Sequence, residues 1–595
     1  MAIRPILLVS ALTFVSVPAV LQAQQIQIQQ MEVTGPDAPP FAMAPGRTLR
    51  TGTGRIRGRV LSESGAPVRR AQVRISGPDI AGRTATTDAD GRYEFLDLPD
   101  GRFTVSASKA GYVTVQYGQT RPREQGKPIE LADKQTLDKA DLVMFRGSAI
   151  TGRIVDEAGE PVADAVVTAM RSEWAAGHRR LVNAGRIGQT NDLGQFRIYG
   201  LPPGDYYVSA TLHNPEGPML DMMGQSAPLP PRTAAAASGY APSYYPGTAS
   251  SADAQKIAVA PGQEAQGIDF PLAQVRLARV SGVVLNSEGK PVEGTMVSLS
   301  SGQGDGLIGM NNSARTNREG AFTLSSVAPG DYDLQVRGMT IITSGGGDAM
   351  MFTARIGGGG GDAEFASQPI SVNGEDLANL VVTTSKGATA SGKVTFEGQR
   401  PPGDLRVTAA AADDGPSPLG SAGSAIAADG TFTLKGLSGP SRVMRIRGLP
   451  AGYALKTVEH NGIDVTDNGV EIKGVDTITG IELVVSSRAS EIAGAVTGAD
   501  GAPIKEFTLV VFAEDADKWT LPATRWVTAA RPDQGGRVRI KAMPAGPYYA
   551  IAVDYLPQGE WNNPETLERL KPSAQHFVLT DGEQKTLDLK IAGGA

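Results

Sequence analysis

A strand–turn–strand phrase recurs along this chain and limits what it can fold into. Its first copy, Thr87–Ala107, places apolar side chains at alternate positions on both sides of a Leu-Pro-Asp-Gly turn, and Thr190–Ala210 and Thr316–Val336 repeat the pattern. Alternation is typical of strands with one buried face, because successive side chains point to opposite sides of a sheet. Proline lacks the N–H that a ladder needs, so the first strand must end at the turn. Each copy therefore predicts two strands of a half-buried antiparallel sheet.

A second phrase opens each copy of the pattern. It runs from a strand with a Gly-x-Val or Gly-x-Ile centre to a Gly-x-Pro-Val or Gly-x-Pro-Ile turn, with clear copies from Ile56, Ile150, Val280 and Ile492 and one from Ala390 that lacks the Pro-Val turn. The spacing of roughly a hundred residues is too long for a solenoid, so each copy should have its own core. The openings predict five domains of similar build.

The predicted fold class is all-β: a tandem array of Ig-like or transthyretin-like Greek-key β-sandwiches. We name the predicted domains repeats 1 to 5, with limits at 51–145, 146–275, 276–385, 386–487 and 488–595. The aromatic strand of the first four repeats should bury Phe95, Phe196, Phe322 and Phe432. Helical spacing is confined to Pro564–Leu570, which predicts one short helix.

Two insertions distinguish the repeats from one another. Pro215–Pro231 is rich in Pro, Met and Gly, and Ser344–Gly361 holds two glycine runs around Met350-Met351-Phe352. Both are predicted to be long flexible loops, serving either as padding or as binding loops on a rigid scaffold.

The first residues have the pattern of a secretory signal peptide. Arg4 supplies positive charge, Ile6–Val20 is an apolar run, and the small Ala23 precedes the predicted cleavage point. The run is too short to span a membrane comfortably. We therefore expect a signal peptide at 1–23, a disordered linker at 24–50, and an exported chain with no transmembrane segment in its mature form. Its location would be the periplasm, the cell surface or the medium.

Composition excludes several classes of function. The chain has no cysteine, which excludes disulfides, thiolate metal sites and a cysteine nucleophile. Its formal net charge is −6 and it lacks a long basic run, so no nucleic-acid partner is expected.

The recurring phrases resemble the carboxypeptidase regulatory-like domain. The residues that carry the resemblance are Ser/Thr-Gly-x-Val, Gly-x-Pro-Val, Thr-x-x-x-Gly-x-Phe and Leu-Pro-Pro-Gly-x-Tyr, which are clear in repeats 1 to 3 and in the opening of repeat 5. Repeat 4 departs from them, with Leu437-Ser438-Gly439-Pro440 at the turn. The resemblance implies a transthyretin-like (prealbumin-like) sandwich of the carbohydrate-binding-like class, in a large exported bacterial protein. It implies a modular surface role and carries no catalytic residues.

Candidate catalytic and metal motifs fail on their context. His213-x-x-Glu216 has zinc-ligand spacing, but Pro215 lies between the two residues and no further histidine is near in sequence. Gly304-x-Gly306-x-x-Gly309 lacks the following helix of a dinucleotide loop. Asp88-Ala89-Asp90-Gly91 is better explained as a hairpin turn than as a calcium loop, although weak calcium binding stays open. We predict no enzyme activity, no cofactor and no metal site.

Repeat 5 gathers the residues that could bind a ligand. The rings of Trp519, Trp526, Trp561 and Tyr548, beside Asn562, could stack on sugar faces while the amide bonds hydroxyl groups. The alternative is that these rings pack in the core or between domains.

These observations predict an exported, non-enzymatic multidomain protein. Its role would be that of an adhesion or scaffold module at the cell surface or in the periplasm, with a polysaccharide or another surface protein as its partner. The alternative is an accessory or regulatory protein of a separately encoded peptidase or glycosidase.

Overall fold

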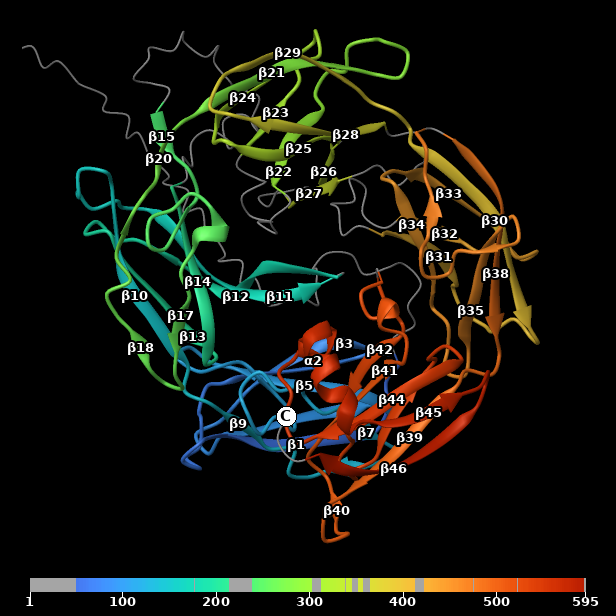
Figure 1. Ribbon diagram of the computed structural model, residues 1–595. Helices are drawn as coiled ribbons and strands as arrows, with labels where there is room; N and C mark the ends of the chain where they lie inside the picture. Colours follow the sequence, from blue (N-terminus) through green and yellow to red (C-terminus); the bar gives the residue numbers. More distant parts are fainter. Residues whose placement is uncertain are drawn as a thin grey trace, which may run out of the picture. The chain divides into compact units, whose positions relative to one another are not determined.

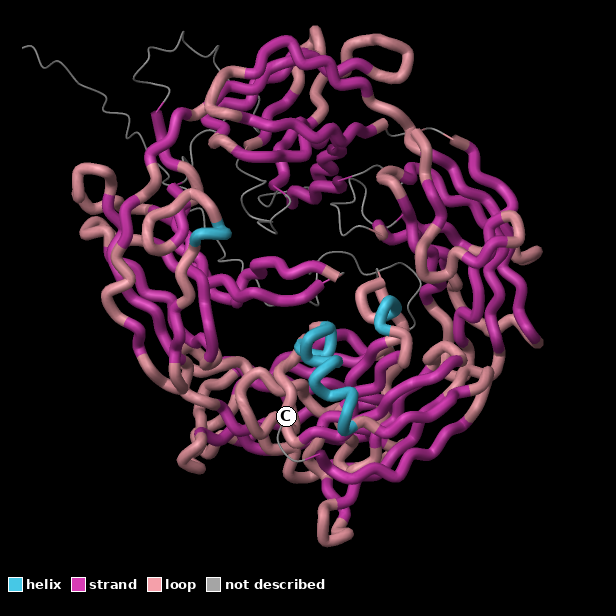
Figure 2. Tube along the Cα trace, viewed as in Figure 1, coloured by secondary structure: helices cyan, strands magenta, loops and turns pink. Residues whose placement is uncertain are grey.

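The computed structural model describes residues 50–592, apart from 176, 213–237, 302–311, 338, 345–350, 357–363, 413–421, 475 and 522. Strands dominate this part of the chain, and its helices are few and short (Figures 1 and 2). Residues Pro39–Ala595 form one compact unit. The predicted signal peptide and the linker up to residue 49 lie outside the described residues. Over the described ranges, no helix is long and apolar enough to cross a membrane.

Repeat 1 is built from two sheets. The strands are β1 (Gly54–Ser62), β2 (Gln72–Gly77), β3 (Ile80–Thr86), β4 (Arg92–Leu98), β5 (Gly101–Ser108), β6 (Val115–Gln116), β7 (Ile129–Leu131), β8 (Thr136–Leu137) and β9 (Leu142–Met144). One sheet has the order β4-β1-β8, with β9 also on β1; the other has the order β3-β2-β5-β6, with β7 also on β5. Buried and exposed side chains alternate along the first part of β4 and along β5, so the predicted half-buried strands are confirmed.

Repeats 2 and 3 are built in the same way. Repeat 2 contains β10 (Ser148–Val155), β11 (Ala165–Ala175), β12 (His178–Gln189), β13 (Gln195–Leu201), β14 (Gly204–Leu212), β15 (Ser238–Tyr240), β16 (Ser243–Tyr244), η2 (Ser251–Asp253), β17 (Ile257–Val259), β18 (Glu264–Ala265), β19 (Phe270–Pro271) and β20 (Gln274–Arg276). Repeat 3 contains β21 (Ala278–Leu285), β22 (Met296–Ser301), β23 (Ser313–Arg315), β24 (Ala321–Val327), β25 (Gly330–Arg337), β26 (Met339–Ser344), β27 (Met351–Ile356), β28 (Phe365–Val372) and β29 (Leu377–Thr383). The main sheets have the orders β13-β10-β18 and β12-β11-β14-β16 in repeat 2, and β24-β21-β29 and β23-β22-β25-β28 in repeat 3.

Repeats 4 and 5 vary the scheme. Repeat 4 contains β30 (Ala388–Glu397), β31 (Arg406–Ala411), β32 (Ala422–Ala425), β33 (Thr431–Leu437), β34 (Ser441–Arg447), β35 (Ala454–His460), β36 (Ile463–Asp464), β37 (Val470–Glu471) and β38 (Thr477–Ser486). Repeat 5 contains β39 (Glu491–Thr497), β40 (Pro503–Ile504), β41 (Thr508–Ala513), η4 (Ala516–Lys518), β42 (Val527–Ala530), β43 (Val538–Lys541), β44 (Gly546–Val553), η5 (Glu560–Asn562), α2 (Pro564–Leu570), η6 (Lys571–Ser573), β45 (Gln575–Leu579) and β46 (Gln584–Ala592). Repeat 4 forms β33-β30-β38-β35-β36 and β32-β31-β34-β37, whereas the strands of repeat 5 join into one sheet because β46 pairs with both β39 and β44.

The first strand of every repeat pairs in parallel with a late strand of the same repeat. The pairs are β1 with β9, β10 with β19, β21 with β29, β30 with β38, and β39 with β46. The strands predicted from the recurring phrase, β4 and β5 in repeat 1, pair only in the antiparallel sense, whereas this parallel pair makes the sheet of β1 mixed. Parallel neighbours need a long crossover connection, and the intervening strands of each repeat provide it.

The glycine of the Ser/Thr-Gly-x-Val phrase explains how close this parallel pair is. A Cβ on Gly58 would lie 2.2 Å from the carbonyl oxygen of Ala140, and one on Gly152 would lie 2.0 Å from that of Ile268. Real Cβ atoms do not approach a backbone oxygen so closely, so only glycine fits. The phrase therefore marks, in the sequence, the strand that takes part in the parallel pair.

The threonine of the Thr-x-x-x-Gly-x-Phe phrase joins two loops in the interior. The Thr87 hydroxyl is buried, accepts from the N–H of Ala71 at 2.8 Å and donates to the carbonyl of Val68 at 2.7 Å. Thr316 makes the equivalent bonds to Thr295 and Val292. One side chain thus satisfies two buried backbone groups, which would otherwise cost free energy.

Each repeat has its own hydrophobic core. Five clusters of buried apolar side chains lie within residues 56–145, 150–272, 278–382, 388–485 and 492–589. Phe95, Phe196, Phe322 and Phe432 are buried in the first four, as predicted. The fold class is that of repeated β-sandwiches, while the domain limits given above stay predictions.

Two further sequence expectations can be compared with the structure. The helix predicted at Pro564–Leu570 is confirmed as α2, whose first turn is capped by the Asn563 side chain accepting from the N–H of Glu565. The loop predicted at Ser344–Gly361 is wrong in part, because Met351–Ile356 forms β27 and pairs with β26. The β-branched residues of Thr340–Thr343 favour that hairpin. The neighbouring glycine runs led to the prediction of a loop instead. The loop predicted at Pro215–Pro231 lies outside the described residues.

Candidate functional site

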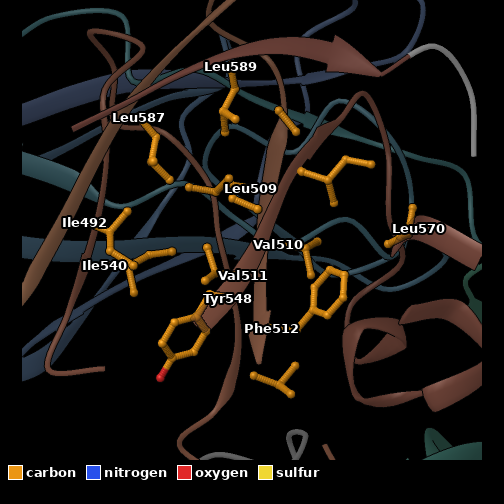
Figure 3. Packing of buried hydrophobic residues seen from close by; sticks show 14 of the residues in the cluster. Ile492, Leu509, Val510, Val511, Phe512, Ile540, Tyr548, Leu570, Leu587 and Leu589 are labelled. Carbon is orange, nitrogen blue, oxygen red and sulfur yellow. The ribbon is translucent and has the colours of Figure 1, made fainter. Parts of the chain in front are cut away.

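Most of the aromatic residues predicted to bind a ligand are buried in the core of repeat 5. Exposure is 3% for Trp519, 8% for Trp526 and 0% for Tyr548. Tyr548 lies among Ile492, Val511 and Ile540 in the core shown in Figure 3. These three side chains present little ring surface to a sugar, so the packing alternative accounts for them.

Tyr548 belongs to the recurring Gly-x-Tyr turn. Its hydroxyl donates to the carbonyl of Pro544 at 2.8 Å, four residues earlier. Tyr332 donates to Ala328 in the same way at 3.0 Å, and Tyr206 donates to Pro202. In repeat 4 the place is taken by Arg442, whose Nε donates to the carbonyl of Ser438 at 2.5 Å. The role of Tyr548 is therefore to hold the turn, and its place in the repeat was visible in the sequence.

Trp519 and Trp526 are each fixed by a hydrogen bond as well as by packing. The Nε1 of Trp519 donates to the carbonyl of Ala513 at 2.7 Å, and its ring meets Phe512 edge to face at 5.5 Å between centroids. The ring of Trp526 stacks on Tyr548 at 6.0 Å, and its Nε1 donates to the Asp467 carboxylate at 2.8 Å. Since Asp467 belongs to repeat 4, Trp526 joins two repeats.

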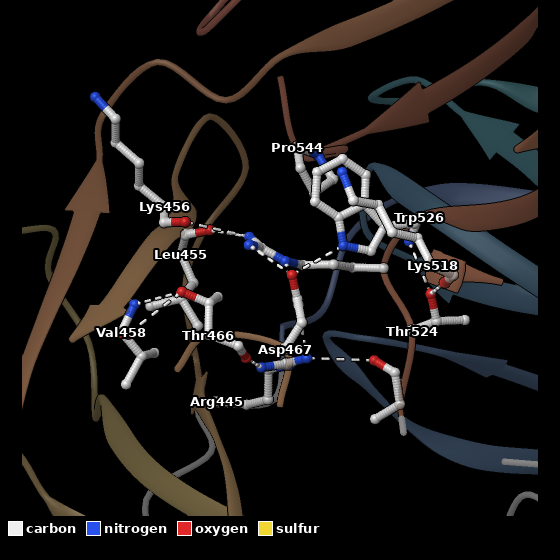
Figure 4. Close-up of polar contacts among 12 residues, drawn as sticks. Arg445, Leu455, Lys456, Val458, Thr466, Asp467, Lys518, Thr524, Trp526 and Pro544 are labelled. Atoms are coloured by element: carbon white, nitrogen blue, oxygen red, sulfur yellow. Dashed lines mark hydrogen bonds and ion pairs between the residues drawn. The ribbon is translucent and has the colours of Figure 1, made fainter. Parts of the chain in front are cut away.

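Asp467 is the centre of a polar cluster between repeats 4 and 5 (Figure 4). Its Oδ1 accepts from the Nε of Arg525 at 2.8 Å and lies 3.6 Å from the Nη2 of Arg445. The Nζ of Lys518 lies 4.0 Å from the centroid of the Trp526 ring. Burial lowers the pKa of Arg445, and Asp467 opposes that effect. The carboxylate is thus saturated by donors, as a structural anchor requires.

A second polar cluster joins repeats 1 and 5. Arg531 is fully buried and forms ion pairs with Glu124, which is 1% exposed, and with Glu506 at 2.8 Å. Lys127 Nζ donates to Glu506 at 2.6 Å and to the carbonyl of Lys505 at 2.7 Å. Burial lowers the pKa of Lys127, although the Glu506 carboxylate raises it. Around them, the N–H of Gln558 donates to the carbonyl of Arg123 at 2.7 Å.

Trp561 and Asn562 are the predicted site residues that reach the surface. Both belong to η5; Trp561 is half-buried against the core and Asn562 is exposed. Sugar binding by these two residues stays a prediction.

Two cavities of about 390 Å³ each lie where repeats meet. The first is lined by residues of repeats 3 and 4, among them Asp333, Ser367, Ser438 and Arg442. The second, which we call the three-repeat cavity, is lined by residues of repeats 1, 2 and 5: Arg123, Arg171, Ser172, Glu173, Trp174, Arg179, Gly204, Asp205, Tyr207, Lys256, Gln558, Gly559, Glu560 and Asn563. Trp174, the one tryptophan outside repeat 5, was missed by the sequence analysis. The charged residues around it in the sequence, which could have indicated a polar site, are Arg171, Glu173, Arg179 and Arg180.

The metal and nucleotide motifs weighed in the sequence have these outcomes. His213, Glu216 and Gly304–Gly309 lie outside the described residues. The hairpin turn at Asp88–Gly91 is confirmed, with the Asp88 carboxylate accepting from the N–H groups of Asp90 and Arg92. Where the structure describes the chain, it has no group of three or more His, Asp or Glu side chains placed to hold a metal ion.

Comparison with known families supports the resemblance in two stretches. Residues 55–143 and 279–343 match the carboxypeptidase regulatory-like domain. They fall in repeats 1 and 3, so the resemblance seen in the recurring phrases is confirmed there. No curated protein matches this chain.

Solved structures with related segments are distant. The Bacillus anthracis TIE protein is 17% identical over 56% of this chain and 51% of its own, with a TM-score of 0.14. A streptococcal ancillary pilin is 12% identical over 56% of this chain and 99% of its own, with a TM-score of 0.18. The minor pilin GBS52 of Streptococcus agalactiae is 12% identical over 38% of this chain and 97% of its own, with a TM-score of 0.19. This chain thus spans about half the length of the first of these proteins, and such TM-scores carry no argument about its function.

Proposed function

We propose that this chain is an exported, non-enzymatic adhesion or scaffold protein of the cell surface or periplasm that binds a polysaccharide or another surface protein. The observation that carries the proposal is the position of the two cavities at junctions between repeats. Ligand sites favour domain interfaces, and cavities of this size hold small ligands or single sugar units. Among the described residues, neither cavity lining includes a histidine, the commonest general base.

Export rests on the sequence of residues 1–23, and the modular role on the resemblance of residues 55–143 and 279–343. Ion pairs and hydrogen bonds between repeats 1 and 5 and between repeats 4 and 5 suit a scaffold whose sites must keep their geometry. The alternative, an accessory protein of a peptidase or glycosidase, uses the same surfaces for an enzyme partner.

A glycan array and a surface-protein pull-down with the chain from Gln24 onward test this proposal. We expect retention of at least one glycan class or one surface protein, with no product released from it. Hydrolysis of a glycan or peptide by the purified chain would overturn the non-enzymatic assignment. Recovery of a peptidase or glycosidase in a fixed ratio would favour the accessory role instead.

A further inference from the structure

The three-repeat cavity has walls that are held in place by contacts between the repeats. The β11–β12 hairpin of repeat 2 reaches repeat 5, where a Cβ on Gly177 would lie 2.9 Å from the carbonyl oxygen of Thr520. Arg179 on the same hairpin forms an ion pair with Glu565 at 3.4 Å. The main chain of Arg123 is bound by Gln558 of repeat 5. A ligand in this cavity would therefore touch three repeats at once.

Two arginines, Arg171 and Arg123, line this cavity, and they differ in their anionic partners. Arg171 is 19% exposed in its side chain and has one carboxylate partner, Glu173, at 3.1 Å. Burial and the nearby charge of Arg123 lower the pKa of Arg171. The guanidinium of Arg123 lies beside Gly204, and among the described residues it makes no side-chain hydrogen bond or ion pair. Like charges held together in a partly buried site favour a bound anion.

Buried donors in the same cavity have no acceptor. The Nε of Arg171 and the Nε1 of Trp174 are buried and find no hydrogen-bond partner within the described ranges. Buried polar groups are normally paired, so an unpaired pair of donors that line one cavity points to an acceptor supplied by a ligand.

The cavity also holds carboxylates, which define the ligand further. Glu173, Asp205 and Glu560 line it together with the arginines and with Lys256, whose Nζ lies 4.0 Å from the Asp205 carboxylate. They would repel a bare sulfate or phosphate, whereas hydroxyl groups can donate to them. A ligand that has one carboxylate and several hydroxyls matches both sets. The guanidinium of Arg179 lies over the ring of Trp174, 5.9 Å from its centroid, so the indole contributes mainly its N–H.

We infer that the three-repeat cavity binds a uronic-acid unit of a polysaccharide, with its carboxylate on Arg171 and Arg123 and its hydroxyls on Asp205 and Glu560. The inference rests on the proposed binding function and names the ligand class of one junction cavity. Trp174 faces the sugar with the edge of its ring and donates its Nε1 proton to a ring or hydroxyl oxygen. The volume of about 390 Å³ admits a single sugar unit.

Calorimetric titration of the chain from Gln24 onward with a uronic-acid oligosaccharide tests the inference, beside a neutral oligosaccharide of the same length and sodium sulfate. We expect heat only with the uronic acid. Arg171→Gln should weaken binding roughly tenfold, because a charge-assisted hydrogen bond is lost. Trp174→Phe, which keeps the ring and removes the donor, should weaken it less. Arg197→Gln, on the exposed surface of the same repeat, is the matched control and should leave binding unchanged.

Several results would overturn the inference. These are no heat with any uronic acid, equal affinity for the neutral oligosaccharide, competition by sulfate at equal concentration, and unchanged affinity in a folded Arg171→Gln variant. If the array retains glycans that lack uronic acids, the proposed function stands and this ligand class is wrong. If no glycan and no surface protein is retained, both are wrong.

Discussion

The tyrosine of the Gly-x-Tyr turn is a residue whose chemistry suits a ligand site but whose use here is structural. In repeats 2, 3 and 5 its ring is buried or half-buried, and its hydroxyl closes the turn by donating to a main-chain carbonyl. Burial raises the pKa of Tyr206, Tyr332 and Tyr548, because the ionised ring would lose its hydration. Burial likewise raises the pKa of Tyr93, which donates to the carbonyl of Ala140.

These tyrosines predict a loss of stability in alkali. Their pKa values are raised in the folded chain above the ordinary value of about 10, so the unfolded chain releases protons that the folded chain retains. The stability they contribute is complete below pH 10 and falls as the pH rises above it. Absorbance at 295 nm, followed with circular dichroism, should show these four tyrosines ionising only as the β signal is lost. Tyr117, Tyr240 and Tyr555, whose pKa is also raised, should ionise later than the other tyrosines. Ionisation of all 14 tyrosines in a chain that keeps its β signal would contradict this assignment.

Among the strands, the feature that all repeats share is the parallel pair formed by the first strand and a late strand. Gly58 lies in β1 under Ala140, and Gly152 lies in β10 under Ile268. The close approach of the two backbones leaves no room for a side chain, and it keeps the ladder of β1 and β9 in register.

Gly58→Ala tests the importance of this parallel pair. The added methyl group forces the segment before β9 away from β1, and we expect a loss of about 1–3 kcal/mol in the stability of repeat 1, as for overpacking in a core. Gly82→Ala is the matched control, because Gly82 lies in β3 of the same repeat and its Cβ would meet the end of the Arg74 side chain at 3.4 Å and the carbonyl oxygen of Ile75 at an ordinary 3.8 Å. Chemical denaturation should separate the two variants. Equal stability of the two variants would show that the parallel pair tolerates a side chain at residue 58.

The sequence predicts local features well and distant partners poorly. Alternation in β4 and β5 identified the strands, and the phrases identified the repeats, because both signals lie within a few residues. The partner of Gly58 is Ala140, about eighty residues later; the phrase around Gly58 marks a strand of the parallel pair, but nothing near either residue indicates which segment is its partner. The aromatic residues of repeat 5 illustrate the same limit. Trp526 has a flat ring of the kind that stacks on sugars, but its position is fixed by stacking on Tyr548 and by a hydrogen bond to Asp467 in another repeat.

At the scale of the whole molecule, the repeats are joined by charged groups that are buried at their junctions. Repeat 1 reaches repeat 5 through Glu124, whose carboxylate also accepts from the N–H and hydroxyl of Thr120 and so organises its own loop. A buried ion pair adds little net stability, but removal of one partner leaves an uncompensated charge.

A double-mutant cycle on Glu124 and Arg531 separates these effects. Arg531→Met should cost about 3–5 kcal/mol, because it leaves the buried Glu124 unpaired. Glu124→Leu combined with Arg531→Met should recover part of that loss, since no charge is then left without a partner, although the N–H of Thr120 loses its acceptor. Unfolding measured by denaturant gives the coupling energy. Additive losses in the double variant would contradict a direct ion pair.

The most direct test of this account is hydrogen–deuterium exchange of the chain from Gln24 onward, compared with its Arg531→Met variant. The central claim is that repeats 1 and 5, which lie far apart in the sequence, pack together and close the three-repeat cavity. Peptides that cover residues 117–127 and 554–560 should exchange slowly in the wild type and about tenfold or more faster in the variant, while β2 and β5 keep their protection. If those peptides exchange in the wild type as fast as an unprotected loop, the junction does not form in solution. The cavity and the ligand assigned to it would then be wrong.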